Sequence, residues 1–257
     1  PEKDSIRIFL NYAKSPLIQQ LQDSIAYRFK SLYGQEQIFS NAIARLQQLI
    51  PGIKMPSVYV AITGFNTAAA VLSDTALILS PEMYFGLGSK FYDTQTWPLF
   101  IQRTMNMDNM AANLLKSYIR FNILPQEEPT DLLGHMLMQG KEAWLMEQIL
   151  PASGDTLAYD YSAVQLKFCK ENEKEIWNYF MREKLVYESN LRKIVKYINP
   201  SPDAPGMPQG APGRIAAFTG ERIVAAYLKR HPQSDMKKFL ADLDARKILD
   251  QSRYKPE

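Results

Sequence analysis

Three polar side chains on one helical stretch are the residues of this sequence best placed to do chemistry. His135, Gln139 and Glu142 lie within DLLGHMLMQGKEAWLMEQIL, at residues 131–150, which is otherwise mostly apolar. Together with Asp131 they are spaced i, i+4, i+8 and i+11, which puts them on one helix face. Such a stripe faces water or lines a cleft, so we expect a binding groove here. The alternative for His135 is a structural imidazole that is hydrogen-bonded in polar surroundings.

Two charged residues further along the chain are expected to complete this groove. Arg214 and Glu221 lie seven residues apart in a predicted helix over residues 213–230, and this spacing places them on one face. Guanidinium and carboxylate groups beside the imidazole would bind a partner through charge and hydrogen bonds. The alternative is an ordinary ion pair, exposed or buried, with a structural role only.

Hydrolytic chemistry lacks its usual sequence signals. The two histidines are His135 and His231, and the HExxH motif of zinc peptidases is absent. No GxSxG, Walker A or GxGxxG motif occurs, and FGLGS at residues 85–89 has the wrong spacing. A Ser–His–Asp triad stays open, because its members meet only in space. We therefore predict no catalytic residue, no metal ligand and no cofactor.

A segment rich in glycine and aromatic residues follows the β-prone part of the chain, at residues 81–97. Its aromatic side chains include Tyr84, Phe85, Phe91, Tyr92 and Trp97. Long irregular segments usually have a task. Binding of a small ligand or partner is one hypothesis, and packing over the edge of the sheet is the other.

Composition bounds the class of protein. The 257 residues are 46% hydrophobic, and 30 basic and 27 acidic residues are spread along the chain, for a net charge of +3. The size supports one large core, and the lack of a basic patch argues against nucleic-acid binding. The single cysteine, Cys169, excludes an intrachain disulfide and predicts a small buried side chain. No run of about 18 apolar residues suggests a membrane span. The charged start without Met is compatible with an exported chain after processing.

The elements that must position these residues begin with helices and a small sheet. Helical spacing predicts an N-terminal helical hairpin over residues 17–50. Three short β-prone runs, divided by GFN and by an aspartate, then predict a small sheet near residues 57–80.

The rest of the chain, residues 98–257, is predicted to be nearly all helix. Its exception is a proline-rich strap over residues 199–212, which cannot form regular structure. We expect an α+β fold, mainly α-helical, with the helices packed around the sheet in a single domain over residues 1–257.

Several blocks of the sequence resemble the GldB-type family of gliding-motility lipoproteins, in the same order and spacing. These blocks are GKEAWLMEQILP at residues 140–151, Trp177 within ENEKEIWNYF, PGRIAAFTGERIVAAY at residues 212–227, SRYKP at residues 252–256, and LSPEMYFGLGSKFYD at residues 79–93. The resemblance runs from about residue 55 to the end and is weaker over the first two helices. It implies an exported lipoprotein of gliding bacteria and their relatives, acylated at an N-terminal cysteine that this chain lacks.

This family is in turn distantly similar to predicted zinc peptidases of the gluzincin type. There, a helix after a small sheet carries HExxH and a later helix brings a Glu ligand. The first of these helices corresponds here to residues 108–121, which contain no histidine, whereas the later one retains Glu142 and Glu147. The resemblance thus implies a zincin-like scaffold without its metal site.

Our first functional hypothesis is a non-catalytic, lipid-anchored cell-envelope protein that binds partners of the gliding or secretion machinery. It would lie at the outer membrane, on the periplasmic or the surface face, and would be attached to the membrane through its N-terminal lipid. One alternative is a zinc-dependent hydrolase with unusual ligands. The other is an envelope protein that binds a small ligand through the aromatic segment.

Overall fold

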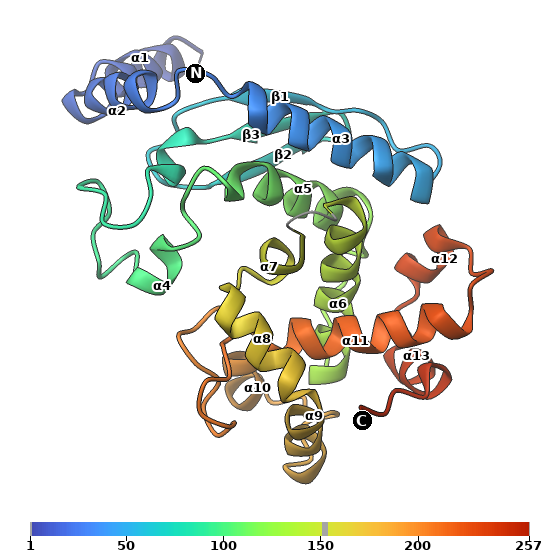
Figure 1. The fold of residues 1–257 in the computed structure, drawn as a ribbon. Helices are drawn as coiled ribbons and strands as arrows, with labels where there is room; N and C mark the ends of the chain where they lie inside the picture. The colour runs from blue at the N-terminus through green and yellow to red at the C-terminus, as the bar shows by residue number, and fades with distance from the viewer. Residues whose placement is uncertain (1, 151–153, 257) are drawn as a thin grey trace. The chain divides into compact units, whose positions relative to one another are not determined.

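The computed structural model describes residues 2–150 and 154–256 (Figure 1). The chain divides into two compact units: residues 1–40 with 55–117, and residues 41–54 with 118–257. The predicted α+β fold, mainly helical with one small sheet, is confirmed. The single domain stays a prediction.

The first unit contains the N-terminal helices. Its helices, two of which continue into the second unit, are α1 (Glu2–Ala13), α2 (Pro16–Arg28), α3 (Tyr33–Leu49), α4 (Leu99–Gln102) and α5 (Asn109–Asn122). Helical spacing predicted the helices of the 17–50 region, but not α1. Proline at the first position of α2 suits a helix start, because its missing N–H would have no partner there.

The sheet of the first unit has three strands in the order β1-β3-β2. Strand β1 (Ser57–Val60) runs parallel to β3 (Ala76–Leu79), and β2 (Ala69–Ser73) runs antiparallel to β3. The predicted sheet near residues 57–80 is therefore present. A short 3-10 helix, η1 (Pro81–Tyr84), follows β3. Within it the buried Glu82 accepts hydrogen bonds from the backbone N–H and hydroxyl of Thr63, at 2.6 and 3.0 Å, and so ties down the loop after β1.

The second unit is built from helices alone among its described residues. After the end of α5 these are α6 (Leu132–Ile149), α7 (Gly154–Tyr159), α8 (Ala163–Glu171), α9 (Glu173–Arg182), α10 (Leu191–Ile198), α11 (Ile215–Arg230), α12 (Met236–Ala241) and α13 (Ala245–Ser252). Cys169, on α8, is fully buried, as predicted.

Helix α6 is the buried centre of the second unit, and α11 crosses it (Figure 1). Asp131 caps α6 by accepting a hydrogen bond of 2.9 Å from the backbone N–H of Gly134. The backbones touch where Gly140 meets Gly220: a Cβ on Gly140 would lie 2.2 Å from the carbonyl carbon of Gly220. The two helices are therefore in backbone contact at this point, with no space for a side chain between them.

The proline-rich segment between α10 and α11 contains no helix or strand. Its ends meet, because the backbone N–H of Arg214 donates to the carbonyl of Asn199 at 3.0 Å. This closure sets the start of α11 and the position of the Arg214 side chain. No helix among residues 2–150 and 154–256 is both long and apolar enough to cross a membrane.

Candidate functional site

The carboxylate of Glu142 lies at the centre of a buried charge cluster in the second unit. Its side chain is 3% exposed, and its Oε1 accepts from Arg214 Nη2 at 3.1 Å. Arg120, at the end of α5, donates to both carboxylate oxygens, with Nη2 2.7 Å from Oε1 and a closer contact from Nε to Oε2. Two guanidinium groups thus neutralise one carboxylate, and both of its oxygens are occupied.

Arg214 also forms an ion pair with Asp160, and the backbone is strained at both residues. Arg214 Nη1 lies 2.8 Å from Asp160 Oδ2. The two residues have φ of 58° and 61°, in the left-handed region that costs free energy for any residue except glycine. Next to Asp160, the hydroxyl of Tyr161 donates to the carbonyl of Gly213 at 3.0 Å. Strained turns from two segments are therefore joined by buried polar contacts.

Glu221 belongs to a second cluster, separate from the ion pairs of Arg214. The side chain of Glu221 is 1% exposed and pairs with the neighbouring Arg222, whose Nη2 also lies 3.7 Å from Glu147 Oε2. Tyr159 donates to the other oxygen of Glu147 at 2.7 Å. Burial raises the pKa of Glu221 to about 7, and the pairing with Arg222 only partly opposes this. Arg214 and Glu221 each form a buried ion pair, and their place in a binding groove stays a prediction.

His135 and Gln139 carry the two incompletely bonded polar groups of the predicted stripe. Gln139 Nε2 donates to the carbonyl of Ile198 at 3.1 Å, which joins α6 to α10. Gln139 Oε1 and His135 Nε2 are both buried and have no hydrogen-bond partner. Burial lowers the pKa of His135, although the carboxylates of Glu128 and Asp131 act in the opposite direction. Burial therefore favours the neutral imidazole.

The hollow beside α6 lies along a different set of its residues. A pocket of about 500 Å³ is lined from α6 by Gly134, Leu137, Met138 and Lys141, and by none of the five residues of the predicted groove. Lys141 is buried and donates to the carbonyl of Leu240 at 3.2 Å, at the end of α12. Burial lowers its pKa to about 8. The predicted groove therefore stays a prediction.

Arg120 and Asp160 were not predicted as members of the site. A carboxylate in an apolar helix signals that a cation must lie nearby, because an unpaired buried charge is costly. The choice of cation depends on how α5, α6 and α11 pack, and no local pattern indicates it. Among the described residues, no group of three or more His, Cys, Asp or Glu side chains is arranged to hold a metal ion.

The raised pKa of Glu221 predicts an acid-side gain in stability. The folded state binds this proton more tightly than the unfolded state, whose pKa is near 4.5. Stability from this group is therefore complete below about pH 4.5 and is lost as the pH rises to about 7, by roughly 3 kcal/mol. Urea unfolding at pH 5 and pH 8 measures the difference. In Glu221→Gln the difference should shrink, whereas Glu171→Gln, on the exposed face of α8, should retain it. If the difference in stability between pH 5 and pH 8 were unchanged in Glu221→Gln, the effect would belong to another group.

The fold and site define a mainly helical protein. Its first unit contains a small sheet, and its second unit contains a buried ion-pair cluster where α6 and α11 cross. The family model described as gliding motility protein GldB matches residues 1–256, so the chain belongs to that family. The family is one of gliding-motility lipoproteins and associates the chain with the cell envelope. No curated protein and no solved structure gives a match.

Proposed function

We propose that this protein is a lipid-anchored envelope component of the gliding machinery, or of secretion linked to it, that acts by binding partners and not by catalysis. Membership of the GldB family supports the setting. We further propose that the scaffold derives from a zinc peptidase of the gluzincin type and has lost the metal site. In this proposal the lipid anchor lies in the outer membrane, and the protein is on the periplasmic or the surface face.

The main support for the non-catalytic role is that both carboxylate oxygens of Glu142 are already hydrogen-bonded. In the zincin-like interpretation, α6 is the helix that would bring a glutamate ligand to the metal. Both oxygens of Glu142 instead accept from arginines, and Arg214 is almost fully buried beside it. A metal ion bound to Glu142 would face two guanidinium groups. It would also take the carboxylate away from Arg214, and breaking a buried ion pair costs about 3–5 kcal/mol. We therefore assign Glu142 a structural role, in which its carboxylate joins α6 to Arg120 and Arg214.

A metal and activity assay tests this proposal directly. The purified protein is dialysed against zinc, washed, and analysed for bound metal and for hydrolysis of casein and of peptidoglycan peptides. We expect neither stoichiometric zinc nor turnover. One zinc per chain that is lost in His135→Ala and kept in His231→Ala would overturn the proposal. His231 is the matched control, because its Nδ1 contacts the carbonyl of Tyr227 at the end of α11, away from the stripe.

Replacement of the ionisable side chains in cells tests the same proposal independently. A strain lacking the gene is complemented with His135→Gln, Glu147→Gln or Glu221→Gln at matched protein abundance, and colony spreading and secretion are measured. A binding protein keeps its function in each variant that reaches matched abundance, because its function requires no proton transfer by these side chains. Loss of function in one variant with normal abundance and anchoring would point to acid–base chemistry at that residue.

A further inference from the structure

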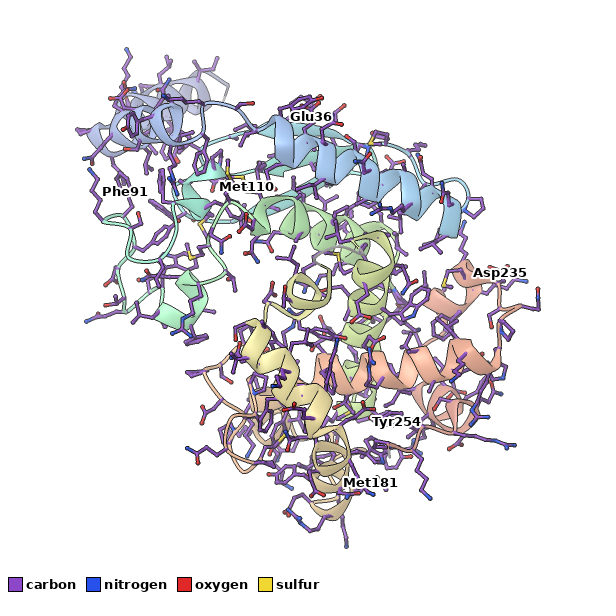
Figure 2. All side chains as sticks on the ribbon, in the orientation of Figure 1. Glu36, Phe91, Met110, Met181, Asp235 and Tyr254 are labelled. Carbon is purple, nitrogen blue, oxygen red and sulfur yellow. The ribbon has the colours of Figure 1, made fainter. Side chains whose placement is uncertain are left out.

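The first unit has a surface hollow of about 460 Å³ between the end of α2 and the segment after η1. Tyr27, Arg28, Phe85, Leu87, Lys90 and Phe91 contribute to its lining. Figure 2 shows Phe91 on the segment after η1, on the side of α2. Its volume is that of an ordinary ligand site.

Aromatic rings give the hollow a rigid floor. Phe85 and Phe91 stack with their centroids 5.1 Å apart and their planes at 28°. The buried Phe29 stacks behind Phe85 at 5.8 Å. Nearby, the backbone N–H of Gly88 donates to Gln102 Oε1 at 3.0 Å and holds the segment in place. Rings that are already ordered lose little conformational entropy when a ligand packs on them.

The charges around this floor favour an anion. Arg28 and Lys90 are exposed, and neither forms an ion pair with any residue that the structure describes, while Lys90 Nζ lies 5.0 Å from the centroid of Phe91. Asp23 supplies the single carboxylate of the lining. The hollow therefore carries a net positive charge beside an aromatic face.

Its rim is apolar and open to solvent. Tyr27 is 81% exposed and Leu87 is 57% exposed. Ser24 and Ser89 belong to the same lining. A hollow with such an exposed rim suits a polymer that passes across it better than a small molecule enclosed on all sides.

We propose that this hollow binds an acidic polysaccharide, with a sugar ring against Tyr27 and beside the stacked pair of Phe85 and Phe91. The carboxylate of the sugar lies toward Arg28 and Lys90, and its hydroxyls pair with Ser24 and Ser89. This ligand site goes beyond the partner binding proposed above. It does not depend on whether the second unit binds a metal, so either proposal can fail alone.

Titration calorimetry with trigalacturonic acid tests the site in the whole protein. Arg28→Gln and Lys90→Gln should each weaken binding about twofold to fivefold, and the double variant by about tenfold. Tyr27→Ala should weaken it about threefold to tenfold through lost ring contact. All three side chains are exposed, so these variants keep the fold. Maltotriose, a trisaccharide that carries no charge, should bind at least about tenfold more weakly than trigalacturonic acid.

Lys30→Gln is the matched control, because Lys30 is exposed and lies two residues from Arg28, outside the lining. Its affinity for trigalacturonic acid should equal that of the wild type. Failure of trigalacturonic acid to bind at millimolar concentration would overturn the proposal. Equal losses in Lys30→Gln and Arg28→Gln would do the same, since they would indicate general charge attraction. Binding of phosphatidylglycerol vesicles through Arg28, Lys90 and Tyr27, with indifference to the sugar, would assign the surface to the membrane instead.

Discussion

Gly220→Ala is expected to lower the free energy of unfolding by about 3 kcal/mol or more. A Cβ on Gly220 would lie 1.7 Å from the carbonyl oxygen of Met136, a backbone atom of α6 that cannot rotate away. The methyl group therefore forces α11 away from α6, and this separation disturbs the most extensive helix contact of the second unit. Urea unfolding followed by circular dichroism measures the change.

Gly34→Ala is the matched control for this prediction. Gly34 is also helical, in α3, but a Cβ there would meet nothing within 4 Å. Alanine should leave stability unchanged or raise it by up to about 1 kcal/mol, because it favours the helix. Equal midpoints for Gly220→Ala and the wild type would show that the two helices pack less closely than the structure indicates.

Glu142→Gln is expected to destabilise the protein by about 3 kcal/mol. The amide keeps the shape of the side chain but leaves the buried Arg214 with one carboxylate, Asp160, in place of two. Arg120 loses its partner as well, at lower cost because its side chain is 55% exposed. Thermal and urea unfolding at pH 7 measure the loss.

A double variant separates this lost pair from a simple loss of packing. Glu142→Gln combined with Arg214→Met should cost less than the sum of the two single changes, because the second change removes the uncompensated charge. Glu171→Gln serves as control, since Glu171 forms an exposed pair with Lys167 at 3.7 Å and should give no measurable change. Additive losses at Glu142 and Arg214 would mean that the pair has no coupling.

Much of the fold was predictable because its signals are local. The three β-prone runs became the three strands, and the apolar stretch after Asp131 became a buried helix capped by that aspartate. Strand and helix periods, turn residues and caps act over a few residues, so a single sequence carries them. Helix α1 was not predicted, and its described apolar residues Ile6, Ile8 and Leu10 are exposed.

The candidate site was predictable only in part. His135, Gln139 and Glu142 were recognised as polar residues on one face of a buried helix, and Arg214 and Glu221 as possible members of an ion pair. The partners were not predictable, because Arg120 and Asp160 lie 22 and 54 residues from the side chains that they contact. The hollow beside α6 also lies along other residues of the helix, which depends on where α12 and α13 pack.

The fold class, the family resemblance and a carboxylate that needs a cation in an apolar helix could all be derived from the sequence. That Arg120 and Arg214 are the cations beside Glu142, and that Arg214 and Glu221 belong to separate clusters, follows from the packing of the helices. The need for glycine at Gly140 and Gly220 also follows only from the packing, because each lies against the backbone of the opposite helix. The physical reason is that propensity and periodicity act along the chain, whereas charge pairing and close packing act across it.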